Sequence, residues 1–370
     1  MPATHEISSQ GDRIAISSPV VIEHTKQVFT LDPLHDPRWK ALVSTHPDAS
    51  VFHQVEWLQA LKSCYGYVPV ALTLCAPGSA LENGLVYCEV RSPLTGKRLV
   101  SVPFSDHCEA LMSDPEQLGF FLTHLTREVG RSHWKYFELR PIFHAFEDKK
   151  NLGVSRNYYF HRLDLRPGEQ ELFRKFHKDS IQRKIRRAER EALRYEVGAS
   201  ETLLHHFYKL LIMTRKRQGL PPQPLKWFRT LVACMGNNAQ VRVAFKGDTA
   251  VASIFTLTTK KSLIYKYGCS DSRFSNLGGT ALLFWNAIQQ AKTNGLEELD
   301  MGRSDLANTG LITFKEHWGA ERSVASYWRY PAGAASSNPE RLIKYATKLI
   351  SVAPDQILAM LGNLLYRHVG

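Results

Sequence analysis

One stretch, residues 265–319, constrains the fold of this chain of 370 residues more than any other. It reads as a strand, a glycine-containing loop, a long helix and a second strand, followed by polar residues and the pair Phe314-Lys315. Such a unit gathers backbone N–H groups and polar side chains at one end of a sheet. Sites for acyl and phosphate-bearing ligands are built there, so the stretch predicts an α/β fold with a binding crevice.

The composition is that of a globular protein with more than one domain. A length of 370 residues suggests two cores, and 44% apolar and 22% charged residues are ordinary values. No run approaches the roughly 18–20 apolar residues that a membrane span needs, and the first residues lack a signal-peptide pattern. The six cysteines show no metal-type spacing. We therefore expect free thiols in a reducing cytoplasm and no metal site.

The net charge of +12 is unevenly distributed. Between Arg174 and Arg194 nine basic residues face three acidic ones, a local excess of 9 − 3 = +6. Apolar residues recur there at helical spacing, which predicts one basic helix over residues 174–194. Two interpretations stay open: a solvated surface, or a landing site for a polyanion such as tRNA, a nucleotide-linked precursor, coenzyme A phosphates or an anionic membrane.

The same order of elements is predicted twice along the chain. The first half has a helix at 55–61, strands at 68–73, 84–90 and 98–102, a helix at 115–129 and a strand at 135–140. The second half has helices at 200–218 and 225–235, strands at 240–245, 250–256 and 262–267, a helix at 279–293 and a strand at 297–301. This parallel predicts a duplicated fold of two mixed sheets with helices packed on them.

The predicted organisation has four parts. They are an N-terminal strand or extension over 1–34, a first domain over 35–168, a second domain over 169–330, and a linker with C-terminal amphipathic helices over 331–370. The tail helices, at 342–350 and 357–365, have three possible roles: packing on the body, pairing with a partner, or lying on a membrane surface. We favour packing.

Several short motifs occur in a fixed order through the second half. They are the basic stretch 183–190, Tyr265-Lys266-Tyr267-Gly268, Ser270-Asp271, Asn294-Gly295, Asp300-Met301-Gly302-Arg303, residues 310–315 and Trp318-Gly319; residues 52–58 and 137–140 extend the pattern into the first half. In this order and spacing the chain resembles the Fem-type aminoacyltransferases and the Fem-like proteins of the GNAT acyltransferase superfamily. The resemblance implies two tandem GNAT-like domains and N-acyltransferase activity. It also implies acyl-coenzyme A or aminoacyl-tRNA as donor co-substrate, with no tightly bound cofactor.

Two features depart from the family pattern. The GNAT pyrophosphate loop, Q/R-x-x-G-x-G/A, is half present, because Asn276 replaces its first glycine. The cofactor-binding residues implied by this loop are Arg273, Asn276, Gly278 and Gly279. The long helical arm of some Fem enzymes has no counterpart here. The first departure argues against coenzyme A and the second against tRNA, so both donors stay open.

The resemblance assigns Lys315 to the negative charge that develops on the donor carbonyl, or to a donor phosphate. Phe314 would anchor the short helix that carries this lysine. Tyr265 and Tyr267 alternate along a strand, which predicts that they share one face, where either could donate a hydrogen bond to the acceptor or the leaving group. We place Tyr267 with the catalytic residues and Tyr265 with the substrate-binding residues.

Further polar residues lie where the last predicted strand ends. Asp300 and Asp305 are candidates to accept a proton from the amine, and both are equally suited to cap the following turn. The guanidinium of Arg303 is suited to form a bidentate hydrogen bond with a phosphate or carboxylate. The predicted substrate-binding set is completed by Ser304, Asp305, Arg183 and Arg186, with Arg186 assigned to an acceptor phosphate. No single general base stands out.

Two other constellations are set aside. His107-Cys108 superficially suggests a thiol nucleophile, but adjacent residues in one loop seldom point at each other. His205-His206 point to different faces of a helix and lack a partner one turn away, so they do not predict a metal site.

Together these features predict a cytoplasmic N-acyltransferase, with the inner face of the membrane as a further location. Its acceptor would be an amine of a small-molecule, lipid-linked or nucleotide-linked envelope precursor, for peptidoglycan or exopolysaccharide. Further candidate partners are tRNA and, through the C-terminal helices, a membrane surface. The alternative is a non-catalytic module that holds a polyanion or a membrane with the basic helix.

Overall fold

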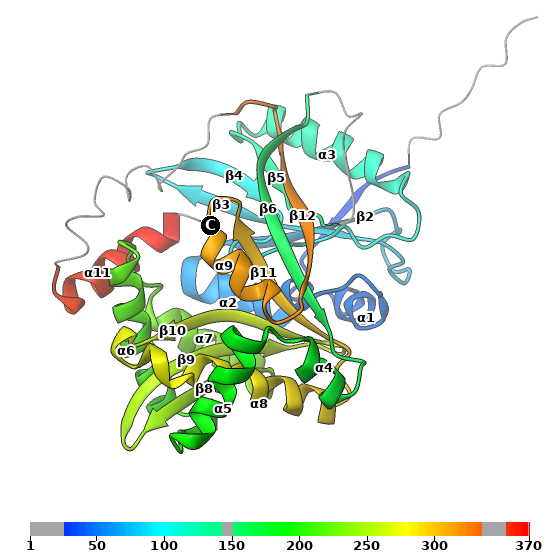
Figure 1. The fold of residues 1–370 in the computed structure, drawn as a ribbon. Helices are drawn as coiled ribbons and strands as arrows, with labels where there is room; N and C mark the ends of the chain where they lie inside the picture. Colours follow the sequence, from blue (N-terminus) through cyan, green and yellow to red (C-terminus); the bar gives the residue numbers. More distant parts are fainter. Residues whose placement is uncertain (1–25, 143–150, 335–352, 369) are drawn as a thin grey trace, which may run out of the picture.

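The computed structural model describes residues 26–142, 151–334, 353–368 and 370 (Figure 1). The first half contains β1 (Phe29–Leu31), α1 (Pro37–Thr45), α2 (Val55–Tyr65), β2 (Val68–Thr73), β3 (Leu85–Ser92), β4 (Gly96–Val100), α3 (Gln117–Arg131), β5 (Phe137–Leu139) and β6 (Gly153–Asp164). The second half contains β7 (Arg194–Gly198), α6 (Glu201–Arg217), α7 (Leu225–Met235), β8 (Ala239–Lys246), β9 (Thr249–Thr258), β10 (Ser262–Ser270), α8 (Gly279–Thr293), β11 (Glu298–Asp305), α9 (Thr309–Glu316) and β12 (Glu321–Tyr330). The predicted mixed α/β class is confirmed.

The twelve strands form one sheet whose order reveals the duplication. It runs β1-β2-β3-β4-β5-β12-β6-β11-β10-β9-β8-β7. Each half contributes five consecutive strands and then exchanges its sixth: β12 pairs with β5, and β6 pairs with β11. Among the strands that the structure describes, only β4–β5 and β10–β11 are parallel pairs, and they stand at equivalent places in the two halves. The repeated order of elements predicted from the sequence is therefore confirmed.

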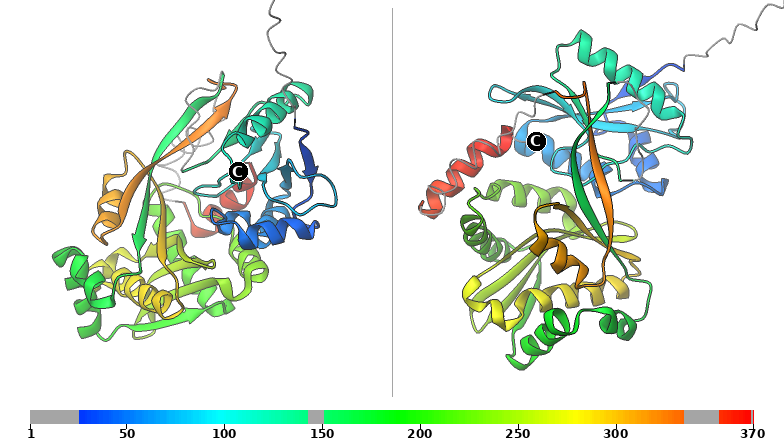
Figure 2. Two further views of the ribbon diagram at one scale, coloured as in Figure 1. Left: turned by 90° about the vertical axis from the view of Figure 1, so that its right-hand side faces the viewer. Right: turned by 45° about the horizontal axis from the view of Figure 1, so that its top comes forward.

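The exchanged strands β6 and β12 join the two halves into a single sheet. They pair along most of their length, from Glu321 opposite Arg162 to Arg329 opposite Gly153. Both figures of the whole chain show these two long strands crossing from one half to the other (Figures 1 and 2). The domain boundary at residue 168 stays a prediction, because the strands on either side of it pair across the halves.

Helices cover both faces of the sheet. α3 packs on β2 to β5 in the first half, and α8 packs on β9 to β11 in the second. On the opposite face α2 lies against α7, where the rings of Trp57 and Trp227 meet edge to face at 5.3 Å. Phe52 and Phe228 belong to the same buried cluster, so the halves share one core. Each such aromatic pair contributes about 0.5–1.5 kcal/mol beyond its buried area.

The single basic helix predicted over residues 174–194 is wrong. The segment forms α4 (Glu169–Lys175), a wide turn of π type (Lys178–Gln182) and α5 (Arg183–Arg190), and β7 begins at Arg194. The break occurs at Phe176, whose backbone is extended (φ −66°, ψ 141°) and whose ring is buried against Trp318 at 4.9 Å. Burying this ring in the core outweighs continuing the helix, although the predicted apolar residues Ile181 and Ile185 are buried as expected.

The C-terminal residues 353–368 and 370, which we call the strap, bridge the two halves. In the strap, α11 (Asp355–Leu365) lies beside α6, and Asp355 pairs with Lys216 at 3.5 Å. Beyond this helix, buried Arg98 of β4 donates to the carbonyl oxygens of His368 and Gly370 at 2.9 Å. Packing of the second tail helix is thus confirmed, whereas the first, at 342–350, lies outside the described residues. Within the described part of the chain no helix is long and apolar enough to cross a membrane.

The strap generates a prediction at Gly362. A Cβ atom on this residue of α11 would lie 2.0 Å from the carbonyl oxygen of Pro222. Gly362→Ala therefore forces the backbone of α11 away from the backbone at Pro222. We expect the free energy of unfolding to fall by about 1–3 kcal/mol in urea titrations. The control is Gly119→Ala in α3, where no atom lies within 4 Å of the added Cβ; that variant should gain about 0.5–1 kcal/mol. Equal stability of the two variants would contradict a close contact at the strap.

Candidate functional site

The site is built where β10 and β11 separate. These parallel strands are paired only from Ser262 opposite Glu298 to Ile264 opposite Asp300. Beyond that point β10 bulges at Tyr265–Tyr267 and stays with β9, while β11 bulges between Asp300 and Arg303 and stays with β6. Bulges bend a strand and redirect its side chains. The result is an opening between β10 and β11, which we call the strand split.

The bulge in β10 overturns the prediction that Tyr265 and Tyr267 share one face. Tyr265 packs on Phe284 of α8, with ring centroids 4.7 Å apart. Tyr267 lies in the other core cluster, where its hydroxyl accepts a hydrogen bond from Trp227 Nε1 at 2.9 Å. The extra residue of a bulge breaks the strict alternation of a strand, which the sequence pattern does not reveal. The roles predicted for the two tyrosines stay predictions.

Four charged side chains meet at the strand split: Asp106, Lys266, Arg303 and Lys315, the charged cluster. Lys266 Nζ lies 2.6 Å from the Asp106 carboxylate, with the lysine side chain only 6% exposed. Arg303 Nε lies 3.7 Å from the same carboxylate. Burial opposes ionisation of Asp106, but these cations outweigh burial and hold the pKa of its carboxyl below the ordinary value. Asp106 is therefore a buried anion paired with cations from both strands of the split.

Lys315 reaches the charged cluster from α9. Its Nζ donates to the carbonyl oxygens of Gly302 at 2.8 Å and Arg303 at 3.0 Å, and the residue is 1% exposed. Burial lowers the pKa of this lysine to about 8, although the neighbouring carboxylates of Asp106 and Asp300 favour its charged form. The structure thus holds a cation of reduced pKa at the point where the strands part.

Gly302 shapes the backbone that receives Lys315. Its φ of +68° lies in the left-handed region, and a Cβ there would lie 3.2 Å from the Asp106 carboxylate. Its N–H donates to Asp300 Oδ1 at 2.7 Å. A side chain at this position would strain the backbone and crowd the anion, so the bulge requires glycine.

The loop that supplies Asp106 is held in an unusual conformation. Val102 and Phe104 have φ values of +52° and +61°, which are rare for side chains of these types. Arg140 Nη1 donates to Val102 O at 2.9 Å, and the Tyr327 hydroxyl donates to Asp106 O at 2.9 Å. Backbone held in sparsely populated regions by its surroundings clusters at functional sites. We therefore count this loop as part of the site.

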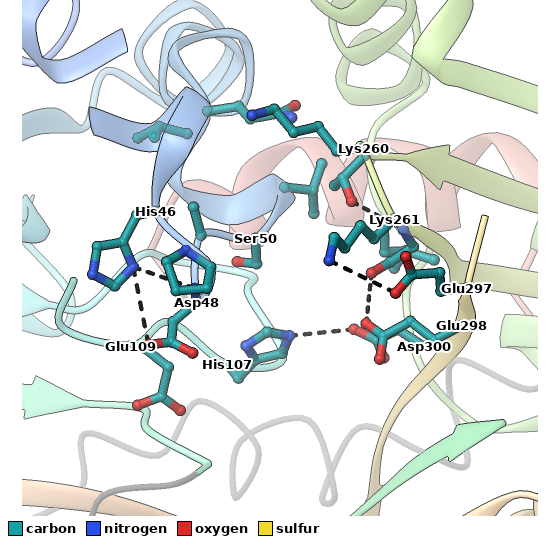
Figure 3. A pocket seen from close by; sticks show the side chains of 18 of the residues that line it. His46, Asp48, Ser50, His107, Glu109, Lys260, Lys261, Glu297, Glu298 and Asp300 are labelled. Atoms are coloured by element: carbon teal, nitrogen blue, oxygen red, sulfur yellow. Dashed lines mark hydrogen bonds and ion pairs between the residues drawn. The ribbon is translucent and has the colours of Figure 1, made fainter. Parts of the chain in front are cut away.

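A cavity of about 770 Å³ opens beside the strand split, between the two halves (Figure 3). It is lined by the end of α1, the short helix Val51–His53, the turn of residues 259–261 and the start of β11. Eight carboxylate side chains line it, against five lysines and arginines. The cavity is therefore acidic in a chain whose net charge is +12.

The sequence predicted part of this site. Lys315, Asp300 and Arg303 are brought together, and Phe314 packs on Phe284 at 5.5 Å as an anchor for α9. Ser304 is buried nearby, whereas exposed Asp305 caps the turn through Ala307 N at 2.9 Å. Asp106 and Lys266 are site residues that the sequence did not predict. Lys266 stands inside the motif Tyr265-Lys266-Tyr267-Gly268, and Asp106 directly precedes the pair His107-Cys108.

Two predicted substrate-binding residues lie elsewhere. Arg183 and Arg186 are exposed on α5, which packs on α8 rather than at the strand split (Figure 1). Arg183 pairs with Asp179 at 3.1 Å, and the guanidinium of Arg186 lies over the ring of Phe173. Any role in binding substrate would be at this basic surface, separate from the charged cluster.

In the loop predicted to bind a pyrophosphate, the space beside the glycines is filled by other residues of this chain. Residues Ser272–Leu277 form a 3₁₀ helix, and Arg273 is bound to Asp271 at 2.6 Å. Gly278 has a φ of +80°, and a Cβ there would lie 2.1 Å from the carbonyl oxygen of Lys184. The close approach that glycine permits is thus made by α5. In this arrangement the residues do not fit a pyrophosphate against Gly278, and the roles assigned to Arg273, Asn276, Gly278 and Gly279 stay predictions.

Comparisons with known proteins agree with the fold. Residues 174–316 match the family model of the acetyltransferase (GNAT) domain. No curated protein matches the chain significantly. Among solved structures, FemX superposes with a TM-score of 0.64 and 13% identity, over 84% of this chain and 98% of FemX. The chain has a Fem-like GNAT fold.

Two further structures share this Fem-like fold. L-PGS from Bacillus licheniformis has a TM-score of 0.52 and 13% identity, over 86% of this chain and 98% of its own. A tandem GNAT protein from the clavulanic acid biosynthesis pathway has a TM-score of 0.52 and 11% identity, over 84% and 99%. The predicted resemblance and the tandem GNAT-like architecture are therefore confirmed.

The charged cluster generates a prediction for Asp106→Asn. Removing one partner leaves Lys266 buried and unpaired, so we expect the free energy of unfolding at pH 7 to fall by about 3 kcal/mol. The folded-state pKa of Asp106 lies below its ordinary value, so its contribution is complete above about pH 4 and is lost as the pH falls further. Urea titrations from pH 7 to pH 3 should show the difference from wild type shrinking. The exposed Asp305→Asn control should change stability little at any pH, and a pH-independent loss in Asp106→Asn would contradict the ion pair.

Proposed function

We propose that this protein is an N-acyltransferase that moves an acyl or aminoacyl group from an activated donor to an amine of a cell-envelope precursor. The observation that carries the proposal is the buried Lys315 Nζ at the strand split, beside a large acidic cavity. The precursor would be lipid-linked, nucleotide-linked or a small molecule, and the reaction would take place in the cytoplasm or at the inner face of the membrane.

Lys315 is suited to stabilise the oxyanion of an acyl transfer. When a neutral amine attacks the donor carbonyl, negative charge develops on the carbonyl oxygen. An ammonium group has three N–H donors, and Gly302 and Arg303 receive two of those of Lys315. The third remains for a substrate oxygen. Because Lys315 is only 1% exposed, this charge interaction is stronger than it would be at the surface.

The donor is open between a coenzyme A thioester and an aminoacyl-tRNA. The GNAT family model supports the first, and the closed loop at Gly278 argues against the usual pyrophosphate position. The exposed basic residues of α5 would suit a polyanionic donor. One neighbour of the same fold is described as a putative lysylphosphatidylglycerol synthetase, which favours an envelope acceptor.

A second candidate function rests on the same surface of α5. As a non-catalytic module, the protein would bind a polyanion or an anionic membrane with an affinity that falls steeply with salt, and it would not depend on Lys315. Thermal shifts with acetyl-coenzyme A, a longer acyl-coenzyme A and a mixed aminoacyl-tRNA pool, followed by transfer assays with the stabilising donor, distinguish the two functions. Binding without any transfer would favour the module.

Substituting Lys315 tests its role directly. We expect Lys315→Ala to fold and to lose about 10²–10³-fold in kcat, as for removal of one oxyanion donor. The matched control is Lys292→Ala, because Lys292 Nζ also donates to two carbonyl oxygens, those of Leu165 and Pro167, away from the strand split. If the two variants lose similar amounts of thermal stability and only Lys315→Ala loses turnover, the result supports a catalytic role for Lys315. Full turnover in Lys315→Ala would end it.

The reduced pKa of Lys315 predicts an alkaline limit to activity. Its charged form is lost as the pH rises through about 8, so kcat/KM should fall above that pH. Arginine stays protonated throughout this range, so Lys315→Arg should remove this limb while retaining part of the rate. The measurement is kcat/KM from pH 6 to pH 10, and an unchanged alkaline limb in Lys315→Arg would assign it to another group.

A further inference from the structure

His107 stands between the charged cluster and the acidic cavity. It follows Asp106 in the loop after β4, lines the cavity and is 5% exposed. Its Nε2 lies 3.2 Å from Asp300 Oδ2. The rings of Phe52 and Phe160 meet the imidazole edge to face at 5.4 and 5.2 Å. These contacts fix the direction of the ring.

The partner of Nε2 decides which ring nitrogen carries the proton. Asp300 Oδ1 accepts the N–H of Gly302, and an ionised carboxylate can only accept hydrogen bonds. Nε2 must therefore donate to Oδ2, which leaves the lone pair of a neutral imidazole on Nδ1. This is the arrangement in which a carboxylate orients a histidine base.

Nδ1 is an acceptor in need of a donor. Among the described residues this buried nitrogen has no hydrogen-bond partner. Leaving a buried acceptor unpaired is unfavourable, and an N–H group of a ligand in the cavity would satisfy it. In Figure 3 the imidazole lies among the side chains that line the cavity, with the Asp300 carboxylate on one side and Asp48 and Glu109 on the other. The carboxylates that line this cavity favour a ligand that carries an ammonium or amine.

We propose that His107 is the general base for the acceptor amine and that Asp300 is its positioning residue. This inference rests on the proposed acyl transfer. The amine lone pair forms the new C–N bond, and the bond from the carbonyl carbon to the donor breaks with its electron pair on the leaving group. The N–H proton passes to His107 Nδ1, and the imidazolium then returns it to the leaving group. The proposed proton acceptor belongs to the pair His107-Cys108, for which the sequence argues against a thiol nucleophile.

The first test reads the tautomer without any turnover. Histidine labelled with ¹⁵N, with the signal assigned by its disappearance in His107→Asn, should show His107 with the proton on Nε2 and a free Nδ1. In Asp300→Asn the amide oxygen can still accept from Gly302, so the amide N–H₂ faces Nε2 and moves the ring proton to Nδ1. A wild-type ring protonated on Nδ1 would overturn the proposal, whatever reaction the protein catalyses.

The second test compares rates. We expect His107→Asn to lose at least about 10²-fold in kcat, the usual contribution of a general base. Asp300→Asn should be slower than Asp300→Ala, because only the asparagine imposes the wrong tautomer; a merely structural role would give the reverse order. His205→Asn, an exposed histidine on α6, should match wild type. Retained turnover in His107→Asn, or a faster Asp300→Asn than Asp300→Ala, would overturn the proposal.

The two tests separate this inference from the function on which it rests. If the wild type transfers no acyl group from any donor, the proposed function fails, and His107 fails with it as a base for this reaction. The tautomer measurement still decides whether Asp300 orients the ring. If the wild type is active and the tautomer or the rate order is wrong, only the assignment of His107 fails.

Discussion

The exchange of the sixth strands, β12 onto β5 and β6 onto β11, is the constraint on which the site depends. β12 carries Tyr327 into the first half, where its hydroxyl holds the backbone of Asp106. β6 carries Tyr158 and Phe160 to the same face, one under the guanidinium of Arg303 and the other against His107. Residues from both halves thereby converge, so the charged cluster exists only when the exchanged strands are in place.

Buried charges around the cluster are paired in a connected network. Glu138 of β5 binds Arg140 at 2.9 Å and Arg329 of β12 at 2.7 Å. Arg140 in turn holds the strained backbone at Val102. Taking such charges from water is expensive, and removing a single partner is more costly than replacing the pair with apolar residues. The network therefore makes the position of the Asp106 loop sensitive to residues that touch no substrate.

Local patterns predicted the elements well and their long-range consequences poorly. α7 and α8 begin and end where the spacing of apolar residues predicted, because periodicity reports a buried face directly. The prediction of one basic helix failed because the helix breaks at Phe176, and this break is decided by a tertiary contact with Trp318. The prediction that Tyr265 and Tyr267 share one face failed for a similar reason, because a bulge leaves no mark in the local sequence pattern.

The candidate site was predictable only on one side of the strand split. The motif that ends at Lys315 lies within one segment, so sequence order brought Asp300, Arg303 and Lys315 together. Asp106 and His107 lie almost 200 residues before Asp300 in the chain, and the exchanged strands bring the two segments together. No local rule reports such a pairing, so the sequence gives no sign that His107 lies beside Asp300.

The strand exchange also bears on how this chain folds as it is synthesised. Trp328 pairs with Leu139, a separation of 328 − 139 = 189 residues. At about 5–20 residues per second the edge of β5 waits roughly 10–40 s for its partner strand to leave the ribosome. An open edge during that time is a template for pairing with other chains. β5 is only three residues long, which keeps this temporary edge short until β12 arrives.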